Sequence, residues 1–117
     1  MKKMQEYFNE LNRVLKTVEE TQTDAMEQAV CAVANALENG GTVFTFGTGH
    51  SHILAEEIFY RAGGLVKVYP ILDAPLMLHV NAARSSRMER VDGYAETLWD
   101  GLETQKGDVL FVFSNSG

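Results

Sequence analysis

The fold is decided by the stretch Thr42-Val43-Phe44-Thr45-Phe46-Gly47-Thr48-Gly49-His50-Ser51. Its first half is a short β-prone run of the kind that forms a buried strand. Its second half is a loop with two glycines, and a helical pattern follows at once, marked by Leu54, Ile58 and Ala62 on one side. The stretch therefore predicts a strand, a tight loop and a helix that closes at Gly63-Gly64.

Two further strands are predicted on either side of a later helix. Residues 65–69 are β-prone and end at Pro70, which has no backbone N–H to donate. Residues 109–113 are apolar at every position, a pattern that suits a parallel strand covered on both faces. Apolar spacings of three and four between residues 91 and 102 indicate the helix. Strands that alternate with helices predict an α/β domain with a parallel sheet and right-handed crossovers.

Two helices are expected before the first strand. Apolar residues recur every three or four positions from Met4 to Val18, which predicts an amphipathic helix over residues 4–22. Thr21 to Asp24 break the pattern and offer a cap for a second helix over residues 25–38. Asn39-Gly40-Gly41 ends that helix, because glycine suits the left-handed position after a helix.

The segment between the second strand and the last helix carries the weakest pattern. From Pro75 it fits either a short helix or a loop packed on the core. Residues 81–90 contain three arginines and two serines, and we interpret them as an exposed polar segment. The arginines, Arg84, Arg87 and Arg90, either belong to a solvated loop or reach a phosphate on a neighbouring subunit.

The composition describes one small acidic domain. The 117 residues carry a net charge of −6, which argues against a general nucleic-acid binder. No apolar run reaches the ~18 residues of a membrane-spanning helix, and the polar start of residues 1–6 argues against a secretory signal. Cys31 is the single cysteine. We therefore expect a cytoplasmic protein without disulfides, in which Cys31 fills the core.

Two strand-end loops carry the candidate chemistry. In residues 47–51, glycines allow a ligand close to the backbone, and the amides of a helix start favour an anion. Thr48 and Ser51 add hydroxyl groups. The second loop, Ser114-Asn115-Ser116-Gly117, follows the most apolar strand and again supplies hydroxyls, an amide and a glycine. Because ligands gather at the carboxyl ends of parallel strands, both loops can converge on one anion.

The first loop taken alone is a weak signal. It lacks the third glycine of the dinucleotide fingerprint and the Gly-Lys-Ser/Thr of a Walker loop. A tight turn capped by Ser51 explains it equally well, and a plain polar turn is the simple alternative for the second loop. The pairing of the two loops is what favours a phosphate site.

Together these loops resemble the sugar isomerase (SIS) domain family over residues 25–117. The resemblance is nearest to stand-alone bacterial SIS-domain proteins related to phosphoheptose isomerase. It implies a flavodoxin-like, three-layer αβα fold of five parallel strands in a homodimer or homotetramer. Residues 1–117 are then a single SIS domain, with residues 1–22 as an oligomerisation helix. Only three strands precede the end of the sequence, so we expect the N-terminal portion of such a domain.

The resemblance also implies roles for individual residues. The phosphate would be held by the two loops: Gly47, Thr48, Gly49, His50, Ser51, Ser114, Asn115, Ser116 and Gly117. Isomerisation needs a base that moves a proton between carbons and a partner that moves one between oxygens. Glu57, Glu56 and His52 are the candidates. Solvated helix carboxylates, and a histidine bonded to loop carbonyls, are the alternatives. We expect no cofactor and no metal.

The first hypothesis is a phosphosugar-binding domain that is an aldose–ketose phosphosugar isomerase in the complete protein. One alternative is a non-catalytic regulator that senses a phosphosugar and passes the signal through oligomer contacts. Another is a lyase or etherase that acts on a phosphorylated amino sugar with the same loops and a glutamate. The expected partner is a phosphorylated sugar, with neither nucleic acid nor membrane.

Overall fold

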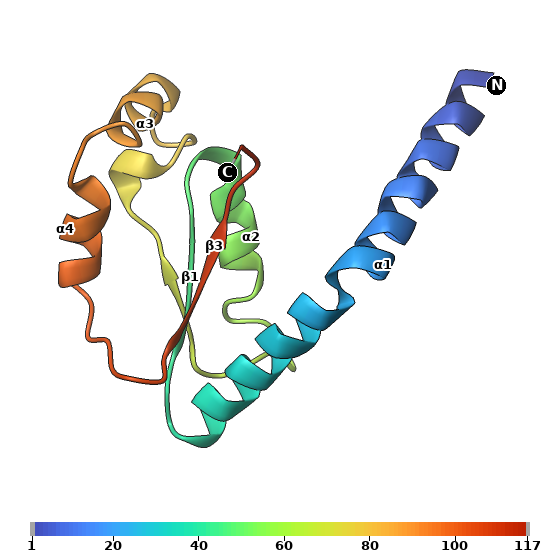
Figure 1. Ribbon diagram of the computed structural model, residues 1–117. Helices are drawn as coiled ribbons and strands as arrows, with labels where there is room; N and C mark the ends of the chain where they lie inside the picture. Colours follow the sequence, from blue (N-terminus) through green and yellow to red (C-terminus); the bar gives the residue numbers. More distant parts are fainter. Residues whose placement is uncertain (1, 117) are drawn as a thin grey trace. The chain divides into compact units, whose positions relative to one another are not determined.

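The computed structural model describes residues 2–116, and the chain divides after Ala34 into two compact units. The first unit is the larger part of one long helix, and the second is an α/β domain. The elements, labelled in Figure 1, are α1 (Lys2–Glu38), β1 (Val43–Gly47), α2 (His52–Glu57), β2 (Val68–Ile71), α3 (Ala82–Met88), α4 (Tyr94–Asp100) and β3 (Val109–Phe113). Two single 3₁₀ turns, η1 (Gly49–Ser51) and η2 (Ala74–Leu76), complete the described chain.

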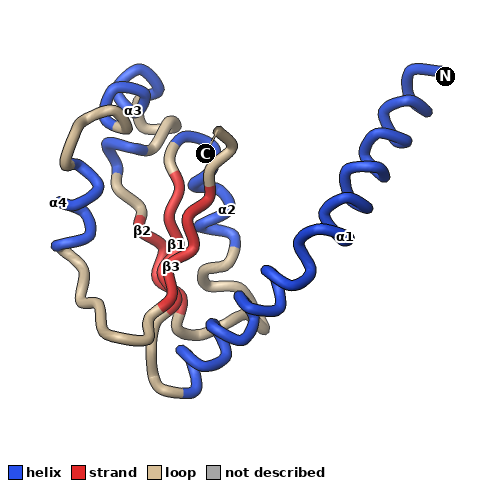
Figure 2. The backbone as a smooth tube through the Cα atoms, in the orientation of Figure 1, coloured by secondary structure: helices blue, strands red, loops and turns tan. Residues whose placement is uncertain are grey.

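The sheet confirms the predicted α/β class. Its three strands are all parallel and lie in the order β2-β1-β3, with β1 in the centre (Figure 2). This is the start of the flavodoxin-like order, in which the first strand lies between the second and the third. Val43 of β1 is in register with both Val68 and Val109, so all three strands begin at the same level.

Helices cover both faces of the sheet and complete three layers (Figure 1). On one face the Thr45 hydroxyl donates to the Ala55 carbonyl of α2 at 2.9 Å. On the other face the Trp99 ring of α4 meets the Phe44 ring edge-on, with centroids 6.0 Å apart. The buried apolar residues Val43, Phe44, Ala55, Val68, Ile71, Leu76 and Met77 make up the core of this domain. Successive residues of β1 point to opposite faces, so this central strand joins both layers.

The prediction of two N-terminal helices is wrong, because α1 is one continuous helix from Lys2 to Glu38. The expected break at Thr21–Asp24 fails because both threonines bond within the helix. Thr21 donates to the Thr17 carbonyl at 2.7 Å, and Thr23 donates to the Glu19 carbonyl at 2.5 Å. Neither hydroxyl is therefore available to cap a new helix. Across residues 2–116 no helix has the length and apolarity that a membrane crossing requires.

Cys31 is exposed on α1, which corrects its expected place in the core. At 100° per residue it lies far around the helix from the row of apolar residues that begins at Met4.

The outer strand β3 also differs from expectation, since Leu110 and Val112 are 41% and 61% exposed. The apolar run therefore identified the strand correctly, but in this chain one of its faces is exposed and the other is only partly covered.

The second strand is displaced from its predicted place. It spans Val68–Ile71 instead of residues 65–69, and Pro70 lies inside it, paired with Thr45. Proline is tolerated here because β2 is the edge of the described sheet and alternate backbone N–H groups point away from β1. The preceding helix ends early at Glu57, and Tyr60 has a left-handed φ of +54° that no helix can contain.

Residues 81–90 are mostly exposed, as expected, but residues 82–88 form the helix α3 instead of a solvated loop. The Asn81 side chain accepts the backbone N–H of Arg84 at 2.9 Å and caps α3. Ser85 is buried and donates to the Ala82 carbonyl at 3.0 Å. The arginines that suggested a loop are exposed on this short helix or just after it. Before it, the segment at Pro75 is the single turn η2, and Leu76 is buried.

Candidate functional site

The two predicted loops leave neighbouring strands at the same level of the sheet. Gly47, the last residue of β1, is in register with Phe113, the last residue of β3. Residues 48–51 and residues 114–116 therefore begin side by side at the carboxyl edge, where Figure 1 shows the segment after β3 next to the start of α2. Gly117, which was assigned to the same loop, lies outside the described residues. The parallel sheet brings together two loops that are 66 residues apart in the sequence.

Position 47 has no room for a side chain, so it requires glycine. A Cβ atom there would lie 2.7 Å from the backbone carbon and oxygen of Ser51 and 2.9 Å from the His52 nitrogen. Real Cβ atoms essentially never come so close to backbone, so the chain can fold back over β1 only at a glycine. Gly49 is different, because it has open space but a φ of +52°. The first loop is thus a tight turn of defined shape.

The hydroxyl groups of the first loop have different surroundings. Thr48 is half-buried, and its Oγ1 donates to Oε2 of Glu89 at 3.2 Å. Ser51 is also half-buried, and its backbone N–H closes the turn by donating to the Thr48 carbonyl at 3.0 Å. His50 is exposed. The turn leads directly into α2, so the partial positive charge of a helix start lies at this edge of the sheet.

His52 lies beneath the first loop. The side chain is 4% exposed, and its Nδ1–H donates to the Gly49 carbonyl. This bond leaves Nε2 as the acceptor nitrogen. The His52 ring lies 5.2 Å from the ring of His79, centroid to centroid. The structure therefore gives His52 a place that holds the loop in shape, as the alternative interpretation had it. Within residues 2–116, His, Cys, Asp and Glu side chains form no group of three suited to a metal ion.

The two candidate carboxylates are exposed on α2. Glu57 forms an ion pair with Arg61, one helical turn further on. Glu56 is also exposed, and its carbonyl accepts the Phe59 N–H at 2.9 Å as the helix ends. Both lie on the helix that follows the first loop, as the spacing predicted. Their proposed role rests on this position alone.

A second group of polar residues at this edge was missed by the sequence reasoning. Glu89 bonds Thr48, and the Tyr94 hydroxyl donates to Oδ2 of Asp73 at 2.6 Å. The hydrogen bond to Asp73 raises the pKa of Tyr94 above its ordinary value, because the carboxylate holds the phenol proton. Tyr94 lies on the helix predicted between residues 91 and 102, and Glu89 lies in the segment with the weakest pattern. No sequence signal linked either residue to a strand end.

A small cavity of about 270 Å³ opens among these residues. Its lining combines Phe46 and Thr48 with Leu76 and with most of the residues from Met88 to Leu98. Three of the lining residues carry a carboxylate: Glu89, Asp92 and Glu96. A partly polar cavity that shares Thr48 with the loop can hold the hydroxyl-bearing part of a small ligand, because carboxylates accept hydrogen bonds from hydroxyls.

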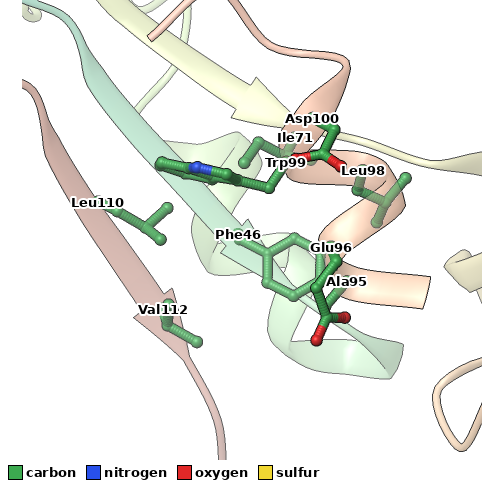
Figure 3. Close-up of a pocket in the computed structure, with 9 residues that line it drawn as sticks. All are labelled: Phe46, Ile71, Ala95, Glu96, Leu98, Trp99, Asp100, Leu110 and Val112. Carbon is green, nitrogen blue, oxygen red and sulfur yellow. The ribbon is translucent and has the colours of Figure 1, made fainter. Parts of the chain in front are cut away.

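Another hollow is apolar and lies along the sheet face that α4 partly covers. It has a volume of about 430 Å³ (Figure 3). Phe46 and Trp99 approach from β1 and α4, and Leu110 and Val112 line it from β3 (Figure 3). Its lining is almost wholly hydrocarbon, which suits packing and not the recognition of a phosphate. We therefore assign the candidate site to the loops at the carboxyl edge.

Comparison with known proteins gives consistent matches. A family profile described as SIS domain matches residues 6–117. The UPF0309 protein of Halalkalibacterium halodurans is 48% identical over 111 residues, 95% of this chain and 44% of that protein. The UPF0309 protein of Geobacillus thermodenitrificans is 48% identical over 112 residues, which is 96% of this chain. That of Listeria innocua is 46% identical over 111 residues, which is 95% of this chain. In each of these two the matched part is 45% of the relative.

These matches show the family of this chain and how much of its relatives' length it spans. The chain spans somewhat less than half of the relatives it resembles. The profile includes both strand-end loops and most of α1, a wider range than residues 25–117. It covers far more than half of the chain, and the sheet order agrees with it. The chain belongs to the SIS domain family.

Proposed function

We propose that this chain binds the phosphate group of a phosphorylated sugar at the carboxyl edge of its sheet. The observation that carries the proposal is the pairing of Gly47 with Phe113, which starts both Ser/Gly loops at one level. Membership of the SIS domain family supports a phosphosugar as the ligand. The proposal includes a cytoplasmic setting, which the single cysteine favours.

The two loops would approach the phosphate from two sides. From the first loop we assign the backbone amides of Gly49 and His50 and the hydroxyls of Thr48 and Ser51. These groups precede α2, where the helix start favours an anion. From the second loop we assign the hydroxyls of Ser114 and Ser116, with Asn115 shaping the turn between them. Gly47 contributes by allowing the turn, since a side chain there has no room.

The sugar would occupy the cavity beside Thr48. Its volume of about 270 Å³ is just below the range of about 300–1,000 Å³ that is usual for small-molecule sites. Glu89, Asp92 and Glu96 would accept hydrogen bonds from sugar hydroxyls, and an amino group on the sugar would suit the same carboxylates. When the phosphate binds, Thr48 would exchange its bond to Glu89 for one to a phosphate oxygen.

For a protein of the relatives' length we propose aldose–ketose isomerisation as the first reaction. A glutamate of α2, Glu57 or Glu56, would move the proton between carbons, and His52 would hold the loop or pass a proton. Loss of turnover in Glu57→Gln with binding retained would support this reaction. Product analysis separates an isomerase from a lyase or etherase that uses the same loops.

Binding without turnover is the second candidate, and the surroundings of the candidate bases favour it. Glu57 is paired with Arg61 on the surface, and His52 is buried under the loop. Such a protein would act as a phosphosugar sensor. It predicts that Glu57→Gln leaves binding unchanged and that no product forms with any ligand of the panel.

A thermal-shift panel tests the binding proposal. Hexose and pentose phosphates should raise the melting temperature of the chain, while the same sugars without phosphate should not. Ser51→Ala and Ser116→Ala should each reduce the shift. Ser86→Ala is the matched control, because this exposed serine lies on α3 outside both loops. A panel without any shift, or a shift that survives both loop variants, would count against the site.

A further inference from the structure

The carboxylate of Glu89 lies directly against the first loop. Its Oε2 accepts the Thr48 hydroxyl at 3.2 Å, and both side chains line the cavity at the carboxyl edge. The bond is longer than the usual ~2.8 Å between a hydroxyl and an oxygen acceptor, so it is easily exchanged. Because a hydroxyl has one proton to donate, Thr48 cannot serve Glu89 and a phosphate oxygen together. Glu89 therefore competes with a phosphate for Thr48.

The helix α3 fixes the position of this carboxylate. The backbone N–H of Glu89 closes the helix by donating to the Ser85 carbonyl at 3.1 Å, and Ser85 is buried. At the other end the Asn81 side chain caps the first turn by accepting the Arg84 N–H. The helix packs against both η1 and η2, so its last residue is held beside the first loop. The contact between Glu89 and Thr48 is thus built by ordered elements.

The negative charge of Glu89 is not held in an ion pair. Within residues 2–116 the ion pairs join Arg13 to Glu10, Lys16 to Glu20, and Arg61 to Glu57. The residues that line the cavity include two further carboxylates, of Asp92 and Glu96, and no lysine or arginine. A phosphate bound to Thr48 would therefore lie beside an unpaired like charge. Even in water, like charges at such short range weaken binding several-fold.

Given the phosphate site proposed above, we propose that Glu89 makes phosphate binding conditional on the sugar. A phosphate without hydroxyl groups takes the Thr48 proton from Glu89 and leaves the carboxylate charged and without that donor. A phosphorylated sugar brings hydroxyl groups into the same cavity, and these donate to the released carboxylate. Glu89 is thus a specificity residue, because an uncompensated charge against the wrong ligand discriminates as effectively as a contact to the right one. It disfavours inorganic phosphate and simple phosphate esters.

The ligand preference of two Glu89 variants tests this role. Dissociation constants of the full chain are measured by calorimetry for hexose 6-phosphate and for ethyl phosphate, a monoester without hydroxyl groups. Glu89→Gln keeps an oxygen that can accept from Thr48 and removes the charge. It should bind ethyl phosphate about tenfold more tightly than the parent, with a smaller gain or a loss for hexose 6-phosphate. Glu89→Ala, which offers no new donor, should reduce the preference for the sugar phosphate in the same direction. Glu89 is exposed, so both variants should fold.

Glu103→Gln is the matched control, because it removes the same charge from an exposed position between α4 and β3. It should leave both dissociation constants unchanged, and an equal effect there would overturn the role of Glu89 in favour of overall charge. Tightening in Glu89→Gln alone would assign the effect to the new amide donor and would also overturn it. An unchanged preference in both Glu89 variants, while the parent binds hexose 6-phosphate, would refute this role and leave the phosphate site standing. A parent chain that binds neither ligand would refute the phosphate site itself, and the role of Glu89 with it.

Discussion

At Gly47 a single hydrogen atom decides whether the first loop can form. A methyl group there would meet the Ser51 backbone at 2.7 Å, so Gly47→Ala should destabilise the chain by about 1–3 kcal/mol. Urea unfolding followed by the fluorescence of Trp99 measures this, because Trp99 is the single tryptophan and packs on β1. Gly101→Ala is the matched control, since its nearest neighbour would be 3.5 Å away. Equal midpoints for the two variants would contradict the account.

Asp108 ties the turn before β3 to the start of β1. Its carboxylate accepts the Thr42 N–H at 2.8 Å and the Gln105 N–H at 2.7 Å, and these bonds lower its pKa. Because its pKa is lower in the folded state, the carboxylate stabilises the fold at every pH above its unfolded-state pKa of about 3.9. This stabilisation is lost as the pH falls through the folded-state pKa. Asp108→Asn should therefore be less stable than the parent at pH 7.

The pH dependence of that difference is the informative measurement. Urea midpoints of both chains, measured from pH 7 to pH 3, should begin to converge as the pH falls below about 4. They should converge further as the pH falls toward the lowered folded-state pKa, because the folded parent carboxylate takes up its proton only there. Asp100→Asn, at the exposed end of α4, is the control and should follow the parent at every pH. A difference between Asp108→Asn and the parent that is constant over the whole range would show that the charge is not involved.

Among the elements, α3 depends on one side chain that the helical pattern did not reveal. The Asn81 cap satisfies the Arg84 N–H, so Asn81→Ala should cost about 1 kcal/mol and loosen α3 selectively. Hydrogen exchange should then be faster at the α3 amides and unchanged in β1. Asn81→Asp keeps an accepting oxygen and should restore protection. Uniform acceleration across the domain would show that α3 does not open as a separate unit.

The elements that could be predicted are those whose own residues determine them. Residues 109–113 are apolar throughout and form β3 with the predicted bounds. The break at Thr21–Asp24 was wrong because threonine hydroxyls can bond inside a helix as well as cap one. Residues 81–90 were misread because α3 is short, capped and mostly exposed, which leaves little apolar periodicity. The local residue pattern thus predicted β3 more accurately than it predicted α1 and α3.

At the scale of the whole molecule, the candidate site depends on strand order. The sequence shows two Ser/Gly loops after two apolar strands, but only the order β2-β1-β3 makes those strands neighbours. Glu89, Tyr94 and Asp73 escaped prediction because their contacts join segments that no local pattern relates. The loops could be predicted from residues, whereas the cavity beside Thr48 follows from tertiary packing alone.

The most direct test of the central claim is an amide NMR titration of this chain with a hexose 6-phosphate. The account predicts chemical-shift changes concentrated in residues 47–51 and 114–116, smaller ones around the cavity at Glu89, and none with the free hexose. Ser116→Ala should reduce the changes in both loops together, because the loops share one anion. Changes confined to one loop, changes elsewhere in the domain, or equal responses to the free sugar would contradict a shared phosphate site.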